Sequence, residues 1–122
     1  MSVLTASSTP ATLTNARLDL VHYSFQEAAR LGVNPEKFIQ LIECESRWKS
    51  DALGDFRSET KEFMASGPLQ WWRSSFDMYS KKYGLLGDYK NPYDQVDLAL
   101  LVLKDGGHKN WYNCMKFIKW KY

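Results

Sequence analysis

One glutamate, Glu45, occupies the apolar face of a predicted helix that runs from Asn34 to Trp48. The other residues of this face are apolar and recur at helical spacing: Phe38, Leu41, Ile42 and Trp48. Apolar surroundings disfavour the charged form of a carboxyl group and therefore raise its pKa. A carboxylic acid that stays protonated near neutral pH can donate a proton to a leaving group, so Glu45 is a candidate general acid. The alternative is a structural acid that pairs with Arg or Lys.

The chain has two cysteines, Cys44 and Cys114, and two histidines, His22 and His108. Their spacing does not suit a metal site, and no metal is expected. The cysteines are either two free thiols or one disulfide. A disulfide that closes a loop of about 70 residues would contribute on the order of 4 kcal/mol in the chain-entropy model. It would also indicate an oxidising compartment.

The composition indicates one compact domain. The chain has 122 residues, 44% of them hydrophobic and 15% aromatic, which is enough for a sizeable core. The net charge of +2 is too small to argue for a nucleic-acid partner. No apolar run approaches the ~20 residues of a membrane span. Residues 1–14 lack a signal-peptide pattern and are rich in Ser, Thr and Ala, which predicts a flexible tail or linker before a domain at 15–122.

Helices are predicted on both sides of Glu45. The first covers residues 16–31, with an inner face of Leu18, Val21, Phe25, Ala28 and Ala29. Asn34-Pro35 and Asn91-Pro92 each combine an N-cap residue with a proline at the first helical position, so each predicts a helix start. A further helix is predicted over 74–83 and a short helix or turn over 109–114. Residues 50–67 lack periodicity and predict a long loop or short hairpin, so the fold is predicted to be mainly α, and α+β at most.

Two motifs resemble those of the lysozyme-like lytic transglycosylase superfamily. Glu45-Ser46 lies within the run ECESRWKSDALGD, and Gly67-Pro68-Leu69-Gln70 lies within ASGPLQW. In that family a helix ends in Glu-Ser, and a Gly-x-x-Gln motif then brings a glutamine to the cleft. The resemblance covers roughly residues 33–114 and implies a lysozyme-like helical globule with its loop or hairpin after the catalytic helix.

The positions of the cysteines are similar to those of the resuscitation-promoting-factor branch of this superfamily. Cys44 directly precedes Glu-Ser, and the run Trp111-x-x-Cys114 lies near the end of the chain. In that branch the two cysteines are bridged, so the resemblance implies a Cys44–Cys114 disulfide. It also implies a secreted, periplasmic or cell-wall-associated protein.

The chain departs from the family's pattern in the predicted helix after Pro92. Gln95, Ala99 and Val102 stand where Asn, Gly and Tyr are common. The tyrosine that lines the cleft in many members is therefore missing from its usual place. Tyr93 and Tyr112 are the candidates to replace it.

The activity implied by the resemblance is cleavage of the glycosidic bond between N-acetylmuramic acid and N-acetylglucosamine in peptidoglycan strands, by a monomer without a cofactor. Glu45 would protonate the departing oxygen and then act as a base for attack by the muramyl 6-hydroxyl, which leaves a 1,6-anhydro product. A hydrolase would use water and usually a second carboxylate. Asp55 is the candidate for that second acid, and a solvated or turn-capping aspartate is the alternative. The lack of a clear second carboxylate favours the transglycosylase.

Four residues near the motifs are candidates for substrate binding. Gln70 can donate to and accept from an N-acetyl group, and its alternative role is to hold the loop together. Ser46 is expected to support the helix end or Glu45 rather than to react, because no His-Asp pair is visible to activate it. Of the adjacent Trp71 and Trp72, one is expected to stack on a sugar ring, and Trp71 is the candidate; ordinary packing is the alternative.

The stretch from Lys109 to Tyr122 interleaves lysines with aromatic residues. Such interleaving occurs in nucleic-acid-binding segments, in surfaces attracted to an anionic cell wall, and in solvated amphipathic tails, which is the reading favoured here. Two other functions stay open for the whole chain. One is a peptidoglycan-binding domain of the same fold that is catalytically inactive, and the other is a basic cytosolic interaction domain with free thiols.

Overall fold

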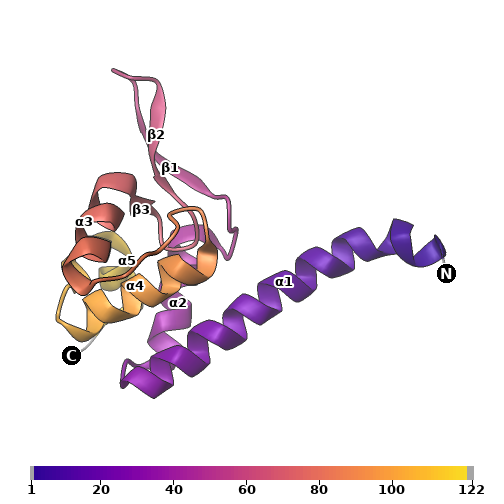
Figure 1. The fold of residues 1–122 in the computed structure, drawn as a ribbon, viewed down its shortest axis with the longest axis horizontal. Coiled ribbons are helices and arrows are strands. Elements are labelled where there is room, and N and C mark those ends of the chain that lie inside the picture. The colour runs from indigo at the N-terminus through magenta and orange to yellow at the C-terminus, as the bar shows by residue number, and fades with distance from the viewer. Residues whose placement is uncertain (1, 121–122) are drawn as a thin grey trace.

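A central helix, α4 (Pro92–Lys104), contacts helices from both halves of the chain (Figure 1). The computed structural model describes the backbone of residues 2–120 and the side chains of residues 15–120. Helix α4 packs against α1 (Ser2–Leu31) and α3 (Arg73–Tyr83). Helix α2 (Pro35–Ser46) packs against α1 and against α5 (Tyr112–Ile118), which follows a short 3₁₀ helix, η1 (His108–Trp111).

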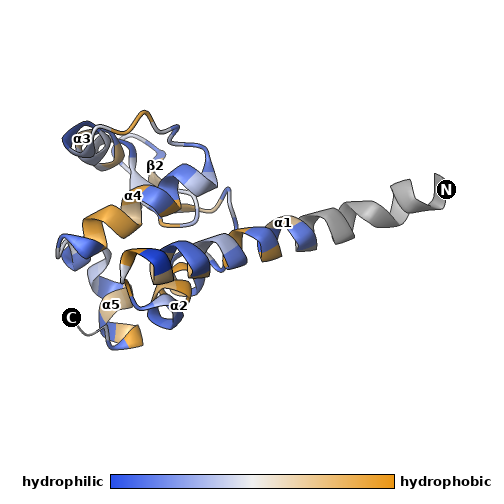
Figure 2. Cartoon of the chain, turned by 60° about the horizontal axis from the view of Figure 1, so that its bottom comes forward, coloured by the Kyte–Doolittle hydropathy of each residue, from blue (hydrophilic) through white to orange (hydrophobic). Residues whose placement is uncertain are grey.

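The core is formed mainly by apolar side chains of α4 and of the helices around it. In α4 the buried apolar residues are Val96, Leu98, Ala99, Leu100, Val102 and Leu103, and Figure 2 shows this hydrophobic stretch in orange. Phe38, Leu41 and Ile42 of α2 are fully buried against the same cluster. Because each large apolar side chain contributes about 1.5–3 kcal/mol on burial, these three side chains fix α2, and with it Glu45, against the core.

The predicted loop contains a small antiparallel sheet with the order β1-β2-β3. Its strands are β1 (Leu53–Arg57), β2 (Glu62–Ser66) and β3 (Trp71–Trp72). The β1–β2 hairpin projects away from the helices in Figure 1. Ala65 pairs with Gly54 on one side and with Trp72 on the other. The prediction of a mainly α fold with a short hairpin after α2 is therefore confirmed.

Both Asn-Pro pairs begin helices as predicted. The Asn34 side chain accepts a hydrogen bond from the Lys37 N–H at 3.0 Å, and the Asn91 side chain accepts from the Tyr93 N–H at 2.9 Å. In each case the proline occupies the first turn, where no backbone donor is needed. Helix α2 ends at Ser46, earlier than the predicted end near Trp48, and α5 extends to Ile118, beyond the predicted 109–114.

Helix α1 differs most from its prediction. It begins at Ser2 rather than near residue 16, so the backbone of residues 2–14 is helical where a flexible tail was expected; the domain boundary at residue 15 stays a prediction. Its buried stripe is Leu20, Ser24 and Ala28, whereas Leu18 and Phe25 of the predicted inner face are 48% and 39% exposed. Among the described residues, no helix combines the length and apolar character needed to cross a membrane.

Candidate functional site

Glu45 lies in the last turn of α2, where the helix ends abruptly. The Ser46 hydroxyl donates to the Ile42 carbonyl at 3.1 Å and accepts from the Trp48 N–H at 3.2 Å. Arg47 then adopts a left-handed conformation, and its N–H bonds to the Glu43 carbonyl at 2.9 Å. Ser46 is buried and acts on the helix end, which is the supporting role expected for it. These contacts hold the backbone on the C-terminal side of Glu45 in one conformation.

Backbone strain is concentrated around Glu45. Six non-glycine residues in the described part of the chain have positive φ, and four of them lie near the site: Arg47, Trp48, Asp55 and Gln70. Each such conformation costs of order 1–3 kcal/mol and persists only where the surrounding structure enforces it. Because strained positions of this kind cluster at functional sites, their grouping supports a functional role for this region.

The Glu45 carboxyl is half-buried. No hydrogen bond or ion pair joins it to another residue in the part of the chain whose side chains are described. Burial, and after it the negative charge of Asp55, together raise the pKa of Glu45 to about 7. At neutral pH a large fraction of Glu45 is therefore protonated. The carboxyl can donate a proton and can take one back, as acid–base catalysis requires.

Asp55 is the carboxylate whose negative charge raises the pKa of Glu45. It lies on β1, is exposed, and has a φ of +52°. The Trp72 indole N–H donates to its Oδ2 at 2.8 Å. The Arg57 guanidinium lies 5.0 Å from the centroid of the Trp72 ring. The charge of Asp55 therefore acts on the Glu45 carboxyl, and the Asp55 carboxylate is oriented by a tryptophan on β3, two strands away in the sheet.

Gln70 holds the loops of the site together. Its Nε2 donates to the Ala52 carbonyl at 3.0 Å and to the Gly67 carbonyl at 2.9 Å. A Cβ added at Gly54 would lie 2.1 Å from the Gln70 Oε1, so this contact requires glycine there. Because both amide protons are used internally, Gln70 retains only Oε1 to offer a substrate, as an acceptor.

Trp71 and Trp72 face opposite ways. Trp71 is 3% exposed, and its indole N–H donates to the Gln95 carbonyl at 3.2 Å. Its ring packs edge-to-face against Trp111 at 5.1 Å. The structure thus places Trp71 in the core, where no sugar ring could reach it. The prediction that Trp71 stacks on a sugar ring is therefore wrong. Trp72, half-buried and bonded to Asp55, is the outward-facing member.

The two tyrosines proposed for the cleft make ring contacts with α1 and within α5, and their role in the cleft stays a prediction. Tyr93 packs edge-to-face on Tyr23 of α1 at 4.9 Å, next to the hydrogen bond from Tyr23 to Asp97 that joins α1 to α4. Tyr112 is 60% exposed on α5 and lines a pocket to which Glu45 does not contribute. Neither tyrosine is grouped with Glu45 by any contact in the described residues.

Cys44 and Cys114 form a disulfide with a Cα–Cα distance of 5.9 Å, as the resemblance implied. The bond joins α2 to α5 at the residue immediately before Glu45. The Lys37 Nζ adds a second connection between these helices by donating to the Ile118 carbonyl at 2.7 Å. A structural disulfide is compatible with a location outside the cytoplasm. It excludes the reading in which both thiols are free.

Gln95 is a positioning residue that the sequence reasoning treated only as a departure from the family pattern. It is 1% exposed on α4. Its Nε2 donates to the Ser66 and Tyr89 carbonyls at 3.0 and 2.8 Å, and its Oε1 accepts from the Leu69 N–H at 3.3 Å. Gln95 therefore fixes the segment that carries Gln70. The signal available in the sequence was a polar residue within the apolar run of α4.

Replacing Gln95 with leucine is expected to destabilise the fold by about 3 kcal/mol, because it leaves one buried and two partly buried backbone groups without their partner. Chemical denaturation followed by circular dichroism measures this change in the free energy of unfolding. Gln26→Leu, at an exposed position of α1, is the matched control and is expected to change it by less than about 0.5 kcal/mol. Equal effects of the two substitutions would show that Gln95 does not hold the loop.

Glu45 is expected to reduce the stability of the fold at neutral and alkaline pH. Its folded pKa, about 7, lies above the ordinary value of 4.5, so the folded state binds more protons than the unfolded state between these values. Stability is therefore lost as the pH rises from about 4.5 through 7. At pH 8 we expect Glu45→Gln to be more stable than wild type by about 2 kcal/mol. This value is already reduced for solvent screening, because the Glu45 carboxyl is partly exposed.

The measurement is denaturant unfolding of wild type and Glu45→Gln at pH 4.5 and pH 8. The stability difference should be small at the lower pH and large at the higher one. Glu43→Gln, on the exposed side of the same helix, is the control and should stay within about 0.5 kcal/mol of wild type. A Glu45→Gln variant that is less stable than wild type at pH 8 would contradict the assignment of a half-buried, unpaired acid.

Comparison of the chain with protein-family models, with curated proteins and with solved structures finds no match. The family suggested by the motifs therefore stays an expectation. Among the described residues, no cluster of three or more His, Cys, Asp or Glu side chains could hold a metal ion.

Proposed function

We propose that this protein is a peptidoglycan-cleaving lytic transglycosylase that acts outside the cytoplasm, as a monomer, on the bond between N-acetylmuramic acid and N-acetylglucosamine. One observation carries the proposal. Glu45 is a half-buried carboxyl at a rigid helix end, without a partner among the described side chains, and its pKa is raised to about 7. The order of the motifs around Glu45 and Gln70 supplies the substrate class.

In the first step the Glu45 carboxyl donates its proton to the oxygen that joins the two sugars, while the bond from that oxygen to the muramyl C1 breaks. In the second step the Glu45 carboxylate accepts the proton of the muramyl 6-hydroxyl as its oxygen bonds to C1. The product is a 1,6-anhydro ring, no water is consumed, and Glu45 regains its proton. A pKa near 7 suits an acid that must also act as a base in the same cycle.

Asp55 supports this mechanism as a negative charge rather than as a reacting group. Its charge helps to keep Glu45 protonated, and an anion near the anomeric carbon stabilises the oxocarbenium character of the transition state. One of its oxygens already accepts a hydrogen bond from Trp72. A muramidase would instead need Asp55 as a nucleophile or as the base for a water molecule.

Digestion of purified peptidoglycan, followed by mass spectrometry of the released muropeptides, tests the proposal. Anhydro-muropeptides are the expected product. Products with reducing ends would assign the site to a hydrolase and Asp55 to its second acid. If wild-type protein binds several wall types but releases nothing from any of them, the chain is a binding domain, and the enzymatic proposal fails.

A further inference from the structure

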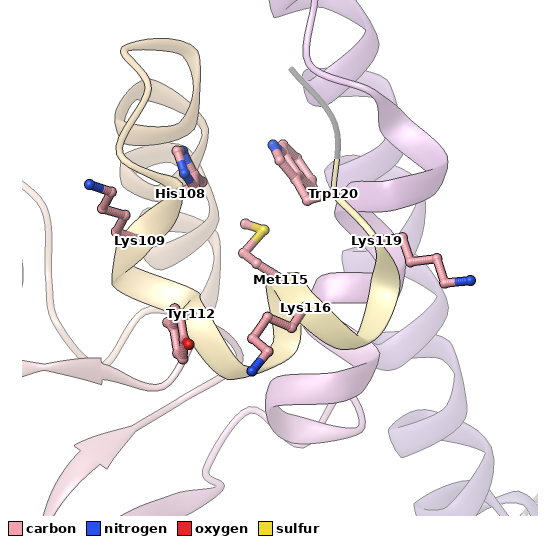
Figure 3. Close-up of a pocket in the computed structure, with 7 residues that line it drawn as sticks. All are labelled: His108, Lys109, Tyr112, Met115, Lys116, Lys119 and Trp120. Carbon is pink, nitrogen blue, oxygen red and sulfur yellow. The ribbon is translucent and has the colours of Figure 1, made fainter.

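Among the described residues of the C-terminal stretch, Trp111 belongs to the core, whereas three lysines and two aromatic residues line a pocket. Trp111 is 4% exposed, and its indole N–H donates to the Leu69 carbonyl at 2.9 Å, so it belongs to the core. Tyr112, Met115 and Trp120 instead line a pocket of 560 Å³ on α5 and the residues that flank it (Figure 3). This volume is typical of sites for small molecules.

The floor of the pocket is apolar. Met115 is buried beneath it, and Figure 3 shows the Met115 side chain between His108 and Trp120. Trp120 is half-buried, and Tyr112 contributes a largely exposed ring. Two aromatic rings and a thioether offer flat, polarisable surfaces on which a planar apolar group can pack.

The rim of the pocket is cationic. Lys109, Lys116 and Lys119 line it, and no aspartate or glutamate of the described residues does. None of the three forms an ion pair with a carboxylate in the described part of the chain. The Lys116 Nζ lies 5.1 Å from the centroid of the Tyr112 ring, so one ammonium group is already held beside an aromatic wall. The pocket therefore offers positive charge that no described carboxylate neutralises.

The pocket is separate from the Glu45 site. None of Glu45, Asp55, Gln70 and Trp72 lines it. Cys114, which joins α5 to α2, is two residues from both Tyr112 and Lys116, and at the helical period such residues point to the opposite side of the helix. The disulfide thus ties one face of α5 to the Glu45 helix and leaves the other face to form the pocket.

We propose that this pocket is a second binding site, for a small anion whose phosphate or carboxylate group is attached to an aromatic ring. The ring would pack on Met115 and Trp120, and the anionic group would bind at the lysine rim. Both parts are required, because partly exposed lysines bind a bare anion weakly and the apolar floor gives no preference for charge. The site does not depend on the proposed catalytic activity.

Phenyl phosphate is the probe, and titration of the ¹⁵N-labelled full chain followed by two-dimensional NMR is the measurement. We expect shifts of the Tyr112 and Lys116 amides and of the Trp120 indole, with a dissociation constant of about 1–5 mM. The double variant Lys109→Gln/Lys116→Gln should bind roughly fivefold more weakly. Lys81→Gln/Lys104→Gln removes the same charge from exposed lysines outside the pocket, and should stay within about twofold of wild type.

Inorganic phosphate and phenol are the comparison ligands, and each should bind at least about tenfold more weakly than phenyl phosphate. The proposal is overturned if phenyl phosphate causes no shifts on α5, or if both double variants bind it equally well. It is also overturned if inorganic phosphate binds as tightly as phenyl phosphate, since the apolar floor would then play no part. If phenol binds as tightly as phenyl phosphate, the lysine rim does not contribute to binding, and the proposal is overturned as well.

Discussion

Replacing Glu45 with glutamine should lower the rate of peptidoglycan cleavage by about 10²- to 10⁴-fold, the usual contribution of a general acid–base group. Glutamine is nearly the same size and also polar, but it has no proton to donate at neutral pH. The fold should survive, because the half-buried acid destabilises the wild-type protein at that pH. Loss of activity in a variant that is at least as stable as wild type cannot be attributed to unfolding.

Release of soluble muropeptides over time, at equal protein concentrations, measures this effect. Glu43→Gln is the matched control, because Glu43 lies two residues earlier on the exposed side of α2. It should leave the rate within about threefold of wild type, as a surface substitution of less than 1 kcal/mol would. A Glu45→Gln variant as active as wild type would remove Glu45 from the mechanism.

Loss of the Cys44–Cys114 disulfide should lower the free energy of unfolding by about 4 kcal/mol. The bond closes a loop with a sequence separation of 70, so its removal restores many conformations to the unfolded chain. Small domains have total stabilities of roughly 5–15 kcal/mol, so the loss is a large share of the whole. The effect should reach the site as well, because α5 is joined to α2 directly beside Glu45.

Denaturant unfolding of wild type, with and without a reducing agent, and of the double variant Cys44→Ser/Cys114→Ser measures this contribution. The reduced wild type and the double variant should unfold at similar, much lower denaturant concentrations. The double variant serves as its own control, because a reducing agent should not affect it. A decrease of less than about 1 kcal/mol would mean that other contacts between α2 and α5 already order the loop.

The features of the fold that depend on local chemistry could be predicted from the sequence. Asn34-Pro35 and Asn91-Pro92 begin helices because the asparagine side chain satisfies amide donors of the first turn. The long segment after α2 could be predicted to lack helix. Its strand pairing, however, depends on contacts between different strands, such as that of Ala65 on β2 with Trp72 on β3. Nothing in a periodicity argument fixes such a register.

The buried face of α1 could not be predicted, because hydrophobicity alone does not say which stripe another helix covers. Leu18 and Phe25 are more apolar than Ser24, yet Ser24 is fully buried and they are exposed. Small residues such as Ser24 and Ala28 let a neighbouring helix approach closely, and only the packing partner reveals that preference.

The sequence pattern indicated a candidate residue where its own position carried the argument, but it could not supply the contacts between candidate residues and their neighbours. Glu45 could be found from its place on an apolar helix face. The choice between Trp71 and Trp72 depended on which face of β3 meets the core, and the structure places Trp71 inside. The role of Gln95 required the positions of Ser66 and Tyr89, which come from other parts of the chain.

The central claim is that burial keeps the Glu45 carboxyl protonated near neutral pH, and titration of that carboxyl by NMR tests it most directly. Proteins labelled with ¹³C at the glutamate carboxyl give one signal per residue, and Glu45→Gln identifies the signal of Glu45. We predict a midpoint near pH 7 in wild type. In Asp55→Asn, which keeps an oxygen for the Trp72 indole, the midpoint should fall but stay above the ordinary value of 4.5. A wild-type midpoint at 4.5 would contradict the account.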